Sequence, residues 1–161
     1  MANFQGILLG TPPTPTESTN PSIKKVTVSV NGSNKTLIPF PHQYMALESW
    51  ETTPNQREEK KAYRDDNTRN LTRVTASGHK TAIKFSTRDD LHLADKKIIQ
   101  KFFTDHESNA NERKISLTYW NDESNTYKTG DFYRGNMTFT IKKITDNDII
   151  YKALSFDIVE Y

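Results

Sequence analysis

The amino-acid sequence predicts a mainly β protein, an antiparallel β-sandwich or open barrel, with one α-helix packed on its flank. Three observations support this fold class: many segments alternate apolar and polar residues, polar turn signals separate them, and a single segment has helical spacing. A chain of 161 residues fits one domain. Only 34% of the residues are hydrophobic, but 8 Phe, 7 Tyr and 2 Trp supply large side chains for a core.

The first part of the chain predicts a short strand, a proline-rich arm and a hairpin. Residues 4–9 are expected to form the strand. Residues 10–22 contain four prolines and are expected to be an extended arm that cannot donate to a sheet at those positions. Valine alternates with Thr and Ser over 23–30, which indicates a half-buried strand. Asn31-Gly32 tolerates the positive φ of a tight turn, so 35–40 is expected to return as the second strand.

A long charged segment, residues 51–73, interrupts the strand-like sequence. A strand candidate over 44–50 precedes it, and strand-like sequence resumes at Leu71. We therefore expect a long charged loop over 51–70 within a single domain spanning 1–161. A loop longer than about 12–15 residues inside a compact domain is usually functional or disordered. The sequence leaves open whether this loop is ordered in the isolated chain.

The middle of the chain predicts a second hairpin and the helix. Residues 71–77 and 81–86 are expected to be its two strands, joined by a turn at Gly78-His79. Apolar residues then recur at intervals of three and four, which predicts an amphipathic helix over about 89–104. The residues of its expected core-facing stripe are Leu91, Ala94, Ile98 and Phe102, and Ile99 and Phe103 widen it.

Beyond the helix we expect a meander of four strands. Alternating apolar residues indicate strands over 115–119, 127–133, 137–141 and 154–161, with polar turns between them. Strands on both sides of a single helix suit a sandwich or an open barrel in which the helix covers one edge or end.

No catalytic, cofactor-binding or metal-binding signature is present in the sequence. G-x-S-x-G, P-loop and G-x-G-x-x-G motifs are missing, and a partial calcium-loop pattern beginning at Asp146 has Tyr151 at its glycine position. The absence of cysteine excludes disulfides and thiol catalysis. The histidines lack metal-ligand spacing: His42, His79, His92 and His106. We expect no enzyme activity and no cofactor; a hydrolase with dispersed residues stays an alternative and requires a deep pocket.

Charge and hydropathy narrow the range of partners. Lys and Arg number 22 and Asp and Glu 20, so a net charge of +2 is too balanced for a nucleic-acid footprint. No run of 18 apolar residues predicts a transmembrane helix, and the first residues lack the charged region of a signal peptide. We expect a location in the cytoplasm or in a particle assembled there, with no membrane partner and no sequence-specific nucleic acid.

The charged segment is the predicted site of contact with other proteins. Its basic residues are interleaved with Glu58, Glu59, Asp65 and Asp66, which weakens nucleic-acid binding. Mixed charge suits protein partners, because complementary charges set register and suppress wrong pairings. The alternative is a solvated loop without a role. The predicted contact residues are Arg57, Lys60, Lys61, Tyr63, Arg64 and Arg69.

The layout resembles that of the small minor structural proteins of long-tailed bacteriophages and prophages. The resemblance covers nearly the whole chain: the V-x-V strand with its Asn-Gly turn, the charged segment, the I-x-F strand, the helix and the final L-S-F-D-I-V-E strand. The most specific segment is K-T-G-D-F-Y-R-G-N, residues 128–136. The layout is also similar to the phage tail-tube superfold, which contractile injection systems and type VI secretion tubes share.

This resemblance implies a non-enzymatic subunit that works by self-association and docking. In the superfold, a sandwich with a flanking helix forms rings, and a long loop reaches a neighbouring subunit or ring. The segment 51–73 would be that contact loop, ordered on assembly, and the proline-rich arm a second contact. Tube, baseplate and tail-completion roles are equally consistent, with other copies of the chain and other tail proteins as partners. The implied location is the virion tail, or the host cytoplasm during assembly.

A small-ligand or carbohydrate-binding β-sandwich module is the alternative function. Such a module would expose a cluster of aromatic side chains on one strand face. The sequence offers one candidate cluster, formed by Trp120, Tyr127 and Tyr133.

Overall fold

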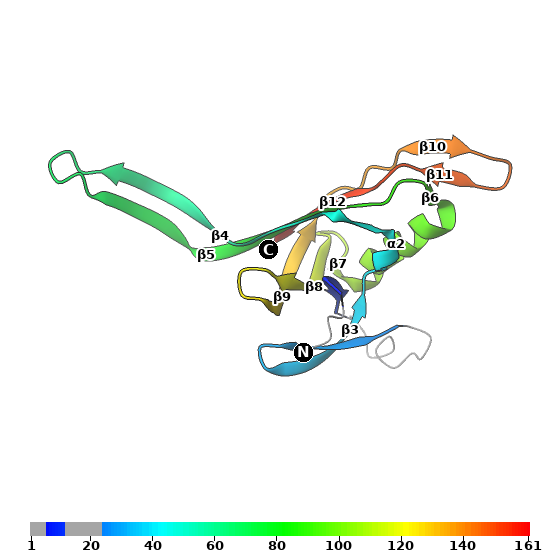
Figure 1. The fold of residues 1–161 in the computed structure, drawn as a ribbon, viewed down its shortest axis with the longest axis horizontal. Helices are drawn as coiled ribbons and strands as arrows, with labels where there is room; N and C mark the ends of the chain where they lie inside the picture. Colours follow the sequence, from blue (N-terminus) through cyan, green and yellow to red (C-terminus); the bar gives the residue numbers. More distant parts are fainter. Residues whose placement is uncertain (1–5, 12–23) are drawn as a thin grey trace.

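The computed structural model describes residues 6–11 and 24–161 (Figure 1). The predicted proline-rich arm over 10–22 lies outside the described residues except for Gly10 and Thr11. The first strand, predicted over 4–9, is observed at Leu8–Gly10.

Most strands belong to one nine-stranded sheet, and a second sheet has three strands. The order in the large sheet is β4-β5-β12-β9-β2-β3-β1-β8-β7, and that in the small sheet is β10-β11-β6. The strands of the large sheet are β1 (Leu8–Gly10), β2 (Val26–Val30), β3 (Ser33–Pro39), β4 (Met45–Arg64), β5 (Leu71–Thr87), β7 (Glu107–Asn109), β8 (Lys114–Asn121), β9 (Thr126–Arg134) and β12 (Ser155–Glu160). Those of the small sheet are β6 (Leu91–His92), β10 (Ile141–Ile144) and β11 (Ile149–Tyr151). A 3-10 turn, η1, spans His42–Tyr44, and helix α2 spans Leu93–His106.

The large sheet closes on itself and is not the predicted antiparallel sandwich. Strand β8 pairs with β1 on one side and with β9 on the other, so β9, β2, β3, β1 and β8 form a five-stranded barrel. The barrel is mixed, because β2 and β9 pair in parallel at Val30 and Tyr127. Closure and the parallel pair both require contacts between distant segments, which alternation within single strands does not specify.

The Asn-Gly hairpin is confirmed. Asn31 and Gly32 have φ values of 51° and 78°, and Val30 pairs with Ser33 across the two-residue turn. The predicted turn at Gly78-His79 is wrong, because β5 continues through it and takes β4 as its hairpin partner. A strand predicted over 137–141 is also wrong in its bounds: residues 135–140 are irregular and β10 begins at Ile141.

The helix is confirmed but lies later in the chain than 89–104. Leu91 and His92 pair with β11, and the Asp95 carboxylate accepts the His92 backbone N–H at 3.2 Å, which caps the helix. The predicted stripe is wrong at Ala94, which is exposed, and at Ile98, which is 47% exposed. It is confirmed at Phe102 and at the flanking residues Ile99 and Phe103. The buried residues of α2 are Ile99, Phe102, Phe103 and His106.

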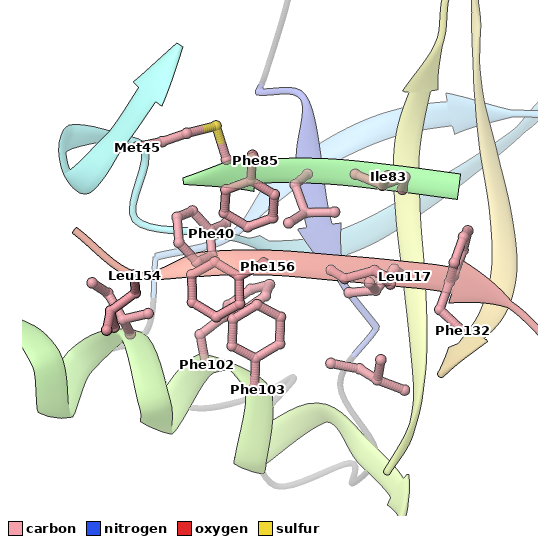
Figure 2. Packing of buried hydrophobic residues seen from close by; sticks show 14 of the residues in the cluster. Phe40, Met45, Ile83, Phe85, Phe102, Phe103, Leu117, Phe132, Leu154 and Phe156 are labelled. Carbon is pink, nitrogen blue, oxygen red and sulfur yellow. The ribbon is translucent and has the colours of Figure 1, made fainter. Parts of the chain in front are cut away.

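The main core lies between α2 and the strands that face it (Figure 2). Phe103 of the helix stacks on Phe156 of β12 with ring centroids 4.9 Å apart, and Phe85 of β5 stacks on the other side of Phe156 at the same separation. Phe40 packs edge-on against Phe102 at 5.2 Å. Such aromatic pairs add to the free energy gained from apolar burial, and they fix the sheet from which β4 and β5 project.

Candidate assembly site: the β4–β5 arm

Strands β4 and β5 form a hairpin that projects away from the rest of the molecule (Figure 1). They contain 20 and 17 residues and pair from Met45 and Thr87 to Arg64 and Leu71. Strand β5 also pairs with β12, but only over 82–86. Residues 56–80, called here the β4–β5 arm, therefore form a two-stranded ribbon with no third strand among the residues that the structure describes.

The predicted loop over 51–70 is therefore wrong. Residues up to Arg64 belong to β4, and the turn occupies only 65–70. The strand escaped prediction because both of its faces meet solvent, so apolar and polar residues do not alternate along it. Leu71, where a strand was predicted to begin, lies at the arm's far end with 51% of its surface exposed.

Hydrogen bonds at Asp65 hold the turn at the end of the arm. The Asp65 carboxylate accepts the backbone N–H groups of Asn67 and Thr68 at 2.9 and 2.8 Å, and these bonds lower its pKa. Arg69 has a φ of 61°, and its N–H donates to the Asp65 carbonyl at 2.9 Å. The turn is therefore defined by local chemistry and needs no partner to form.

The base of the arm is fixed to the barrel. Asn55 has a φ of 53°, and the pairing register shifts between Thr53 and Gln56, so the ribbon bulges there. Thr52 donates to the Asp122 carboxylate at 3.0 Å, and the Asn55 amide donates to the Glu123 carboxylate. Both acceptors lie in the β8–β9 turn, so the barrel determines the direction in which the arm leaves.

The outer arm has two different faces. Register pairs Tyr63 with Thr72 and Lys61 with Val74, which places these four residues on one face, called here the Tyr63 face. Tyr63 and Val74 are 50% and 47% exposed, and the Lys61 ammonium lies 5.1 Å from the Tyr63 ring centroid. This face presents an aromatic and an aliphatic side chain to solvent.

Polar contacts occupy most of the opposite face, which also exposes Leu71 across from Arg64. The register pairs Ala62 with Arg73, whose guanidinium approaches the Glu59 carboxylate at 2.5 Å. Arg64 donates to the Arg69 carbonyl at 3.2 Å. These basic groups therefore have partners within the arm, which makes the Tyr63 face the better candidate for contact with another molecule.

The outer part of the arm, residues 57–73, has a net charge equal to that of the whole chain. Residues 57–73 hold six basic and four acidic residues, which leaves 16 of each sign elsewhere in the sequence. The structure brings all six predicted contact residues onto this one hairpin. Sequence reasoning missed Leu71 and Val74 as exposed apolar residues of the arm; the β-branched residues Thr72, Val74 and Thr75 were the available signal.

Other surfaces of the described residues offer weaker sites. Three shallow hollows have volumes of about 280–330 Å³ and mixed linings. No group of three acidic or histidine side chains is placed to hold a metal ion in the part of the chain that the structure describes. The candidate aromatic cluster does not form, because Tyr127 is buried against Trp120 while Tyr133 is 46% exposed.

Among the described residues, the fold and the arm together define a mainly β protein: a mixed five-stranded barrel, one α-helix and a long projecting hairpin. The chain belongs to DUF6711, a family of unknown function whose model matches residues 30–161. No curated protein matches the sequence. Among the described residues, no helix is long and apolar enough to cross a membrane.

One solved structure with a similar chain is the tail of an empty GTA (gene transfer agent) particle with C6 symmetry. That chain is 10% identical, and the match covers 89% of this chain and 94% of the other. The TM-score between the two chains is 0.45.

Proposed function

We propose that this protein is a non-enzymatic structural subunit of a phage or prophage tail, acting through self-association and docking to neighbouring tail proteins. Tube, baseplate and tail-completion positions all suit the proposal, and the location would be the virion tail. The single observation that carries it is the β4–β5 arm, an ordered hairpin that projects from the barrel and exposes Tyr63, Leu71 and Val74. The layout resemblance of the sequence supports the choice of a tail.

A partner would stabilise the arm. An isolated two-stranded hairpin is marginally stable in water, and large apolar side chains at its end gain free energy when another surface covers them. Tyrosine and arginine, together with tryptophan, are enriched among the residues that contribute most to binding energy at protein interfaces. The arm offers both types, with Arg57, Lys60, Lys61, Tyr63, Arg64 and Arg69 as the proposed contact residues.

The free edge of β4 is a poorer contact than the faces of the arm. Edge strands that avoid uncontrolled pairing carry bulges, proline and charged side chains. In β4 the register shifts between Arg57 and Glu59 and again between Glu59 and Lys61, and Pro54 lies nearer the base. A partner that binds the side chains on one face of the arm would form a defined assembly, whereas strand pairing at the open edge of β4 would lead to aggregates.

Shortening the arm tests the proposal. Residues 58–78 would be replaced by Asn-Gly, which joins the paired residues Arg57 and His79 through a two-residue turn. We expect the midpoint of thermal unfolding to change little, because none of the removed residues is buried. Sedimentation velocity over a concentration series, with electron microscopy, should show that the wild-type chain assembles and that the arm-shortened protein does not. Equal assembly by both proteins would overturn the proposal.

A further inference from the structure

Strand β1 completes the barrel although it has only three residues. It pairs antiparallel with β3, where Leu9 lies opposite Pro39, and with β8, where Leu9 lies opposite Thr118. Without β1, a groove would remain between β3 and β8, with unpaired backbone groups on both sides. The groove between β3 and β8 therefore needs a short extended segment to satisfy its backbone hydrogen-bonding groups.

The two leucines of β1 join the two parts of the core. Leu8 packs in the large cluster beside Phe40, and Leu9 packs in the smaller cluster beside Val28 and Leu37. Both leucines are fully buried. Successive side chains of a strand point to opposite faces, so one short segment fills a pocket on each side of the barrel wall.

At each end of the segment 6–10, a histidine ring leaves room for glycine but not for a residue with a Cβ atom. A Cβ on Gly6 would lie 2.5 Å from the His42 ring, and a Cβ on Gly10 would lie 2.7 Å from the His106 ring. His42 Nε2 also accepts the Ile7 backbone N–H at 3.2 Å, and the Tyr127 hydroxyl donates to the Gly6 carbonyl at 2.7 Å. The groove thus recognises G-I-L-L-G, residues 6–10, as a bound peptide would be recognised.

The chain between β1 and β2 is long enough for β1 to reach another molecule. Fifteen residues, 11–25, connect the two strands. A segment of that length spans at most about 50 Å when extended. In the sheet β3 lies between β2 and β1, so β1 is held by its groove and not by pairing with the strand that follows it.

We propose that β1 is an exchangeable strand, and that in the assembled protein the segment 6–11 of one copy occupies the groove between β3 and β8 of a neighbouring copy. The occupant is the same in both forms, so every strand contact of the closed monomer is regained. The two forms differ in which copy supplies the strand. Neighbouring copies in an assembly raise the local concentration of the competing strand, which favours exchange there.

Disulfide trapping tests the exchange, because the wild-type chain has no cysteine. Thr11 Oγ1 and Ser116 Oγ lie 3.5 Å apart at the end of the groove, and the Thr11 N–H donates to the Ser116 carbonyl at 3.2 Å. Thr11→Cys and Ser116→Cys chains would be co-refolded, allowed to assemble, oxidised, and run on a non-reducing denaturing gel. We expect a reducible mixed dimer, which can form only when β1 of one chain lies in the groove of the other.

A matched control uses a pair that exchange cannot separate. The Thr118 and Thr129 hydroxyl oxygens lie 2.6 Å apart within the β8–β9 hairpin of a single chain. Thr118→Cys mixed with Thr129→Cys should therefore give no mixed dimer. A chain carrying both Thr11→Cys and Ser116→Cys should form an internal disulfide when dilute and covalent multimers when assembled, which shows that the pair can bond in either state.

The outcomes separate this inference from the proposed function, on whose self-association it rests. Exchange is overturned if the wild-type chain self-associates while the double-cysteine chain forms only internal disulfides and the mixed chains stay unlinked. Mixed dimers together with normal assembly of the arm-shortened protein would uphold exchange and overturn the role of the arm. A wild-type chain that stays monomeric at every concentration would overturn both.

Discussion

The Arg134 guanidinium lies 2.8 Å from the Glu107 carboxylate, and their side chains are only 9% and 11% exposed. The pair joins the last residue of β9 to the residue that follows α2, and the guanidinium also lies 5.6 Å from the Phe103 ring centroid. It therefore ties the helix to the barrel close to the main aromatic core. A buried charge that loses its partner is costly, because neither water nor an opposite charge then compensates it.

We predict that Glu107→Ala lowers the free energy of unfolding by about 3–5 kcal/mol, since Arg134 would stay buried without its counter-charge. Urea denaturation at neutral pH measures the change. The control is Glu59→Ala, which removes the exposed ion pair with Arg73 and should cost less than about 1 kcal/mol. Equal losses in the two variants would show that Arg134 gains access to water when Glu107 is removed.

The lowered pKa of His42 leads us to predict that the free energy of unfolding falls in acid. Burial lowers the pKa of His42 below 6.5, with a further contribution from the Lys24 charge. The folded state uses the neutral ring, because Nε2 must accept the Ile7 N–H. Between the folded pKa and 6.5 the unfolded chain binds more protons, so the free energy of unfolding falls as pH drops through that window. Denaturation between about pH 5 and about pH 8 should show this slope, and His42→Gln should reduce it.

His92 provides a control of opposite sign. The Asp148 carboxylate, 2.6 Å from the ring, raises the pKa of His92 above 6.5. Its contribution to stability is therefore complete below 6.5 and is lost as pH rises through the raised pKa. His92→Gln should leave the acid-side slope in place. A slope that disappears in the His92 variant and persists in the His42 variant would contradict our assignment.

The sequence predicted those parts of the fold that depend on residues close to one another along the chain. The Asn31-Gly32 turn and the helix are set by short-range geometry and spacing, so the sequence contained their signals. The β4 side of the arm carries no such signal, because this strand is solvated on both faces. The fit of β1 in its groove depends on His42 and His106. His42 lies 36 residues from Gly6 in the sequence, and His106 lies 96 residues from Gly10. Closure of the barrel by β8 is likewise a contact between distant segments.

A substitution at Gly10 tests how specifically the groove between β3 and β8 fits β1. Gly10→Ala should lower the free energy of unfolding by about 1–3 kcal/mol, because its Cβ would lie 2.7 Å from the His106 ring and the ring is held by a hydrogen bond to the Phe102 carbonyl at 2.5 Å. The matched control is Gly78→Ala in the arm, where a Cβ would meet no atom within 4 Å and φ is not positive. That substitution should be neutral or stabilise by up to about 1 kcal/mol. A cost at Gly78 equal to that at Gly10 would contradict a specific fit of β1.

The two faces of the arm should differ in their effect on assembly. Tyr63→Ser with Val74→Ser removes the exposed apolar groups of the Tyr63 face, whereas Arg64→Ser with Leu71→Ser alters the opposite face to a similar extent. Removing an interface hot spot costs about 2 kcal/mol, or about 30-fold in an association constant. We expect that loss for the Tyr63 face and a smaller loss for the opposite face, because the Arg64 guanidinium already has a partner in the Arg69 carbonyl.

Sedimentation equilibrium of the two double variants measures this difference, and their thermal unfolding should match, since all four side chains are exposed. Equal weakening by both would mean that a partner surrounds the ribbon. Such a result would favour insertion of the arm into a groove over docking on a flat surface. A larger loss for the Arg64 variant would reverse the assignment of the contact face, because the charged side of the ribbon would then supply the binding energy.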